Sequence, residues 1–114
     1  MTELYHTDIN MPDHLKSPIF QGVLKYSQHA KSESTGDKYG NITLPLKFEA
    51  KNAKLIEVEF DENSKKVLKQ VWRQQLDETR DLILVIGENG FVRTVWCNLR
   101  SDTHRSLNPS KYVR

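Results

Sequence analysis

The most regular hydrophobic pattern in the chain is a pair of apolar runs separated by a short turn. Residues 81–86 (DLILVI) and 91–97 (FVRTVWC) are rich in β-branched and aromatic residues, which favour strands. The four residues between them (GENG) contain an Asn-Gly pair, which supplies the positive backbone angles of a tight turn. The two runs therefore predict a β-hairpin.

A second strand pattern occupies residues 55–60 (LIEVEF), where Ile56, Val58 and Phe60 alternate with Leu and Glu residues. A period of two is typical of a half-buried strand. Residues 61–64 (DENS) then predict a turn.

Residues 65–76 (KKVLKQVWRQQL) fit two different structures. Their apolar positions lie three and four residues apart, as in a helix capped by Ser64. The same residues also fit a strand that pairs with residues 55–60. Helix propensity slightly favours the first structure and the short preceding turn favours the second, so the pattern leaves both open.

The region before these segments predicts one strand and one helix. Residues 19–26 (IFQGVLKY) predict a strand, which Gly22 weakens. Ser27 is a suitable N-cap for a short polar helix over residues 28–35 (QHAKSEST). We expect that helix to end at Gly36, which tolerates the left-handed C-cap conformation.

The remaining segments are turn-rich, and the whole pattern predicts an α+β fold. Residues 37–45 (DKYGNITLP) predict a loop that leads into an edge strand, and residues 1–18, with two prolines, predict an irregular N-terminal arm. We expect a short helix packed across an antiparallel sheet of four or five strands. The chain has 114 residues, the length of one domain, which we place at residues 19–114.

Composition excludes several classes of protein. Hydrophobic residues make up 37% and charged residues 28%, which argues against wholesale disorder. No run approaches the roughly 18 to 20 apolar residues that cross a bilayer, and residues 1–10 lack the features of a secretory signal. Cys97 is the only cysteine, so an internal disulfide is excluded. We therefore expect a cytoplasmic protein with no membrane partner.

Charge is distributed unevenly along the chain. The net charge is only +2, but residues 93–114 hold five Lys and Arg residues against a single acid, Asp102. A local basic patch is enough to neutralise phosphates, so a compact RNA-binding or RNA-cleaving domain fits this distribution. A solvated basic tail without a ligand is the alternative.

The strongest candidate for chemistry is the polar run at residues 98–105 (NLRSDTHR), directly after a predicted strand. Binding and catalytic groups often lie on loops at the ends of rigid strands. The glycine-rich phosphate loop, the HExxH and CxxC metal motifs and the Gly-x-Ser-x-Gly elbow are all absent from the sequence. Nucleotide hydrolases and metalloproteases are therefore disfavoured, and we expect no cofactor.

Two imidazoles with nearby cations can cleave RNA without a metal. One group removes the 2′-hydroxyl proton, another protonates the leaving oxygen, and a cation stabilises the charge on phosphorus. The candidate catalytic residues are His29 and His104 as acid and base, Arg73 and Arg100 as phosphate-charge stabilisers, and Tyr39 as a stacking or proton-bridging group. The candidate substrate-binding residues are Lys38, Asn98, Asp102, Arg105 and Tyr112.

Each candidate also has a purely structural explanation. His29 and His104 fit ordinary surface histidines, and aromatic residues such as Trp72 and Trp96 usually pack in a core. Cys97 fits a small core residue, because nothing in its local sequence lowers the pKa of a thiol. Asp102 and His104 have no third ligand at a suitable spacing, so we expect no metal site.

A resemblance to a known family comes from residues 24–29 (LKYSQH). This hexapeptide resembles the strand-to-helix entry of the phage RegB-type endoribonuclease. The order of a helix followed by an antiparallel sheet resembles the RelE-like and barnase/EndoU/colicin-like group of small ribonucleases. The resemblance implies metal-independent, context-selective RNA cleavage in which His29 takes part in proton transfer. The chain differs from RegB in length and has no second histidine directly after the helix, so His104 is assigned from chemistry alone.

These observations predict a small endoribonuclease of phage or toxin-like type, with RNA as its partner. The alternative is a non-catalytic phage-type protein that binds and inhibits a host protein through a sheet edge or its polar arm. An inhibitor of the ribonuclease is a further expected protein partner.

Overall fold

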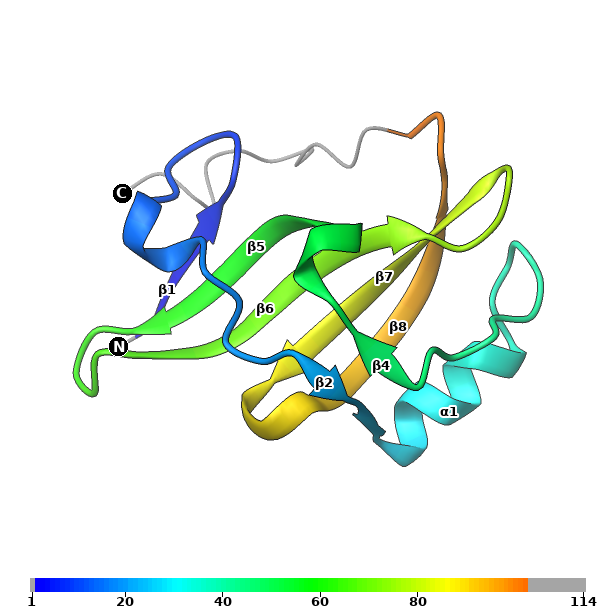
Figure 1. Ribbon diagram of the computed structural model, residues 1–114, viewed down its shortest axis with the longest axis horizontal. Helices are drawn as coiled ribbons and strands as arrows, with labels where there is room; N and C mark the ends of the chain where they lie inside the picture. The colour runs from blue at the N-terminus through cyan, green and yellow to red at the C-terminus, as the bar shows by residue number, and fades with distance from the viewer. Residues whose placement is uncertain (1, 103–114) are drawn as a thin grey trace.

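The computed structural model describes residues 2–102, which form an α+β fold around a six-stranded sheet (Figure 1). Neighbouring strands are antiparallel, except that the last one, β3, runs parallel to β8. In spatial order the strands are β1 (Thr2–His6), β5 (Ala53–Asp61), β6 (Lys66–Gln75), β7 (Arg80–Gly87), β8 (Phe91–Leu99) and β3 (Lys25–Tyr26). The predicted fold class is confirmed, although the sheet is mixed and larger than the expected four or five antiparallel strands.

The smaller elements lie around this sheet. The single helix among the described residues is α1 (Gln28–Thr35), and a second sheet pairs β2 (Gly22–Val23) with β4 (Lys47–Phe48). Residues 2–102 also contain three 3-10 turns: η1 (Asp13–Leu15), η2 (Ala50–Asn52) and η3 (Glu88–Gly90).

The segment 65–76 forms a strand over Lys66–Gln75, which settles the question that the sequence left open. β6 pairs with β5 on one side and with β7 on the other, and the side chains of both faces are buried over residues 70–73. A central strand that is buried on both faces carries apolar residues without a strict period of two. The spacing of its apolar residues therefore resembles that of an amphipathic helix.

Two further predictions at the N-terminal side were wrong. Residues 2–6, expected to belong to an irregular arm, form β1, because pairing with β5 orders a sequence with little pattern of its own. Residues 19–26, expected to form one strand, divide into β2 and β3, which belong to different sheets. Gly22 has φ of 124°, a backbone angle that interrupts a regular strand.

Helix α1 begins as predicted and ends differently. The Ser27 hydroxyl oxygen accepts the Ala30 N–H at 3.0 Å, which is a normal N-cap. Gly36 has φ of −124°, so the expected left-handed C-cap does not form. The helix packs against β8 rather than across the middle of the sheet, as Figure 1 also shows.

The sheet has two faces with different surroundings. The main core lies on the first face, beneath β2, β4 and residues 11–24, where Phe48 and Trp72 pack with ring centroids 5.1 Å apart. The second face carries a smaller cluster of Ile56, Val71, Ile83 and Val85, against which Trp96 packs. The candidate site residues of β6, β7 and β8 lie on the second face, as described below.

Candidate functional site

An arginine–aspartate–arginine cluster occupies one end of the second face. Arg73 Nε donates to Asp81 Oδ2 at 2.7 Å, and Arg73 Nη2 donates to the Leu99 carbonyl at 3.1 Å. Arg100 Nε lies 3.6 Å from the other carboxylate oxygen of Asp81. Asp81 therefore holds both guanidinium groups together.

Strand register explains why these residues meet. Arg73 on β6 lies opposite Ile83 on β7, and Asp81 is two residues earlier on the same face of β7. Arg100 follows β8 directly, and its backbone N–H donates to the Thr79 carbonyl at 2.9 Å. The cluster is thus built from three adjacent strands.

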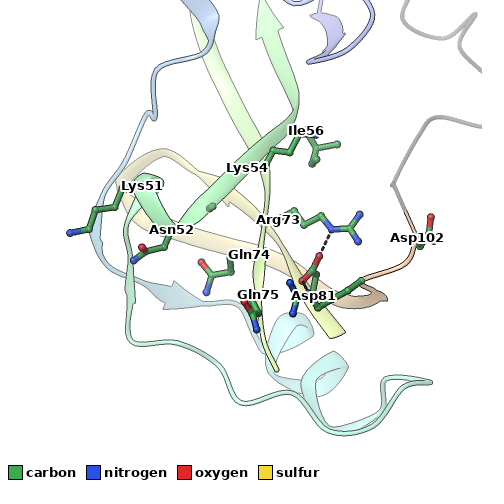
Figure 2. Close-up of a pocket in the computed structure, with 11 residues that line it drawn as sticks. Lys51, Asn52, Lys54, Ile56, Arg73, Gln74, Gln75, Asp81 and Asp102 are labelled. Carbon is green, nitrogen blue, oxygen red and sulfur yellow. Dashed lines mark hydrogen bonds and ion pairs between the residues drawn. The ribbon is translucent and has the colours of Figure 1, made fainter. Parts of the chain in front are cut away.

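The cluster lines a shallow depression of about 520 Å³, in which Arg73 and Asp81 point toward each other (Figure 2). The side chain of Arg73 is only 9% exposed and is held by Asp81 and Leu99, whereas that of Arg100 is 45% exposed. Arg100 is therefore the better placed of the two to contact a ligand. Among the described residues, four cations and two carboxylates line the depression: Lys51, Lys54, Arg73, Arg100, Asp81 and Asp102. This excess of positive charge suits a phosphate group.

A second arrangement lies where α1 meets the edge of β8. β3 pairs with only the first two residues of β8, so other groups must bind the backbone N–H groups farther along that edge. Glu33 Oε1 accepts the Val95 N–H at 3.2 Å and the Thr94 hydroxyl, and Asp37 Oδ1 accepts the Cys97 N–H at 3.1 Å. Two carboxylates thus accept the backbone N–H groups that a neighbouring strand would otherwise bind.

His29 stands one helical turn before Glu33 and contacts it. His29 Nε2 lies 3.4 Å from Glu33 Oε1, and the two side chains are 71% and 30% exposed. The carboxylate is fixed by β8, while the imidazole is largely in solvent. An accessible carboxylate beside an imidazole is a pair of groups that can exchange protons with a ligand.

The same edge contains a depression of about 460 Å³ beside α1. Its lining includes Glu33, Lys38, Trp96 and Asn98, so two of the predicted substrate-binding residues lie next to the His29–Glu33 pair. Tyr39 lies close by, with its ring centroid 4.9 Å from Lys38 Nζ.

The structure thus divides the predicted site residues into two groups. Arg73, Arg100 and Asp102 come together in the first depression, whereas His29, Lys38, Tyr39 and Asn98 lie around α1 and the second depression. The groups adjoin through Asn98, which lies opposite Asp81 in the sheet register. The remaining candidates, His104, Arg105 and Tyr112, lie outside the described residues.

Sequence reasoning missed Glu33 and Asp81. The spacing of His29 and Glu33, four residues apart on a helix, was a usable signal, because such residues are neighbours on the helix surface. Asp81 had no comparable signal, since its role depends on the register of three strands.

Cys97 has the surroundings of a structural residue. It is buried, and this burial is the main cause of a raised pKa of its thiol. The negative charge of the nearby Asp37 carboxylate raises the pKa further. A thiol that resists ionisation is a poor nucleophile.

Comparison with known proteins gives no relative. No protein-family model, no curated protein sequence and no solved structure matches this chain significantly. Among the described residues, no group of three or more His, Cys, Asp or Glu side chains is placed to hold a metal ion. None of the helices in residues 2–102 has the length and apolar character needed to cross a membrane.

Proposed function

We propose that the protein is a metal-independent endoribonuclease whose acid and base are His29 and Glu33. The observation that carries the proposal is the 3.4 Å contact between an exposed imidazole and a carboxylate fixed by β8. The cationic depression lined by Arg73 and Arg100 supports it, because an RNA substrate brings phosphates. The resemblance of residues 24–29 to a ribonuclease motif is consistent with the role of His29.

The proposed reaction needs only side-chain chemistry. Glu33 removes the proton of a ribose 2′-hydroxyl, and the 2′-oxygen forms a bond to phosphorus. The bond from phosphorus to the 5′-oxygen breaks, and the imidazolium of His29 gives its proton to that oxygen. The products are a 2′,3′-cyclic phosphate and a free 5′-hydroxyl. Glu33 then holds the proton that the 2′-hydroxyl lost, so protons and electrons balance.

Two cationic groups are available to stabilise the negative charge of the RNA. Lys38 lines the depression that Glu33 lines, so it is the nearer candidate for the phosphate that reacts. Arg100, with Arg73 behind it, is the candidate for a neighbouring phosphate. Glu33 takes the acid–base role that the sequence prediction gave to His104, which lies outside the described residues.

The proposal is tested by incubating the purified protein with a labelled RNA in EDTA. We expect cleavage with 2′,3′-cyclic phosphate ends, and no cleavage of the same strand when its 2′-hydroxyls are replaced by hydrogen, because the attacking oxygen is then missing. The matched variants are His29→Ala and His14→Ala, since His14 is an exposed histidine far from α1 in the sequence. The cleavage rate of His29→Ala should be about 10² to 10⁴ lower than that of the parent protein, and the rate of His14→Ala should equal the parental rate.

Three results would contradict the proposal. They are activity that requires a divalent ion, unchanged cleavage by His29→Ala, and absence of cleavage under all conditions. The last result would favour a non-catalytic protein that binds a host protein through its sheet edge.

A further inference from the structure

Three side chains on β8 connect the two depressions. Thr94, Trp96 and Asn98, which we call the β8 stripe, alternate along the strand and share one face because successive side chains point to opposite sides. Thr94 donates its hydroxyl to Glu33, so the stripe begins at the proposed acid–base pair. Asn98 lies opposite Asp81, so the stripe ends at the cationic depression.

Trp96 is the central member of this stripe and has an amphipathic position. It packs against the apolar cluster of the second face, yet it is only partly buried and lines the same depression as Glu33. The packing holds the indole in place, and the accessible part offers an aromatic surface. Aromatic side chains on strands are platforms on which unpaired bases stack.

Positively charged side chains lie at the Asn98 end of the β8 stripe. Arg100 follows Asn98 by two residues and lines the depression with Lys51 and Lys54. From Thr94 to Arg100 the chain spans about 20 Å, at about 3.3 Å per residue of strand. A ligand that reaches from one end to the other is therefore longer than a single nucleotide.

We propose that the β8 stripe is a binding track for single-stranded RNA, with one base stacked on Trp96 and a phosphate beyond it held by Arg100. This inference rests on the proposed function, because it names the substrate of the same site. A base within a duplex is already stacked on both sides and cannot pack flat on Trp96. The track therefore selects single strands.

The test uses a strand of 2′-O-methyl RNA, which has no free 2′-hydroxyl and stays intact during the measurement. Its binding to the full-length protein is followed by fluorescence anisotropy in EDTA and compared with that of the same strand in a duplex. We expect the single strand to bind more tightly than the duplex. Trp96→Leu should weaken single-strand binding about five- to a hundredfold, and Trp96→Phe should retain most of it, because stacking needs a ring.

Two further variants complete the experiment. Phe91→Leu removes an exposed aromatic residue at the start of the same strand, outside the stripe, and should leave binding unchanged. Arg100→Ala, at a position whose side chain is 45% exposed, should reduce the slope of log affinity against log salt by about 0.7.

The inference is overturned if the duplex binds as well as the single strand, if Trp96→Leu folds and binds like the parent protein, or if Arg100→Ala leaves the salt slope unchanged. It is also overturned if the single strand does not bind. Cleavage of ordinary RNA is measured separately. Cleavage without Trp96-dependent binding would refute the binding track and leave the proposed ribonuclease function standing. Trp96-dependent binding without cleavage would refute the ribonuclease function and leave the binding track standing.

Discussion

Gln70 is a fully buried polar residue in the centre of β6, and its side chain connects this strand to the N-terminal segment at Ser17 and Ile19. Its Oε1 accepts the Ile19 N–H at 2.9 Å and the Trp72 indole N–H at 3.1 Å. Its Nε2 donates to the Ser17 carbonyl at 2.8 Å. One amide thus fixes the N-terminal segment over the main core.

Replacing Gln70 with leucine should lower the free energy of unfolding by about 2 to 5 kcal/mol. The substitution keeps the size of the side chain but leaves partly buried donors and acceptors without partners, each of which costs about 1 to 3 kcal/mol. Chemical denaturation measures the difference. Gln75→Leu is the control on the same strand, because Gln75 is exposed and should change the value by no more than about 0.5 kcal/mol. Equal effects of the two substitutions would contradict the role given to Gln70.

The loop after α1 is held to the sheet by one arginine of β7. Arg80 Nη1 donates to the carbonyls of Tyr39 and Asn41 at 3.1 and 3.0 Å, and Arg80 Nε donates to Asp77 at 2.7 Å. Lys38 and Tyr39 belong to this loop, so Arg80 positions predicted site residues without touching a substrate. The hydrogen bond from Arg80 is the main cause of a lowered pKa of Asp77.

The Asp77–Arg80 pair should make stability depend on pH in the acid range. A carboxyl whose pKa is lower in the folded state than its usual value of 3.8 stabilises the fold above that value, and this contribution is lost as the pH falls through the lower folded pKa. Asp77→Asn should therefore reduce stability at neutral pH and make less of a difference below about pH 4. Denaturant unfolding from pH 2 to pH 7 measures this, with Asp13→Asn as control, because the Asp13 side chain is 98% exposed. A difference between parent and Asp77→Asn that stays constant over this range would contradict the assignment.

At the scale of the whole molecule, the main core and the candidate site lie on different faces of the sheet. Its first face is closed by β2, β4 and the N-terminal segment, whereas its second face and the β8 edge carry the candidate site. Both groups of site residues depend on β8, which supplies Thr94, Trp96 and Asn98 and leads into Arg100. Substitutions of Thr94, Trp96 and Asn98 should therefore affect both groups.

The parts of this arrangement that the sequence predicted are those with a local signal. The hairpin of β7 and β8 follows from two apolar runs and an Asn-Gly turn, in which Asn89 has φ of 60°, and Ser27 marks the start of α1. Residues 66–75 pair with strands adjacent in sequence, but burial of both faces removes the period of two that would mark them as a strand. β1 and β3 depend on partners far along the chain, which a short sequence window does not contain. This non-local pairing is also why the helix was expected over the sheet rather than along β8.

The candidate site shows the same division. Arg73 and Arg100 were selected as individual cations, but only the register of β6, β7 and β8 brings them to one carboxylate. The spacing of His29 and Glu33 on α1 was a local signal for their contact, but the binding of Glu33 to the edge of β8 has no local signal. The gathering of residues around His29 therefore required the three-dimensional structure.

The central claim is that Glu33 is a base in RNA cleavage and does more than bind the edge of β8. Glu33→Gln tests it directly, because the amide oxygen of glutamine still accepts the Val95 N–H and the Thr94 hydroxyl but does not remove a proton at neutral pH. The measurement is the rate of RNA cleavage in EDTA, compared with the unfolding midpoint of the same sample. We predict a rate at least about 10² lower than that of the parent protein, with a nearly unchanged midpoint. Cleavage by Glu33→Gln at the parental rate would contradict the account.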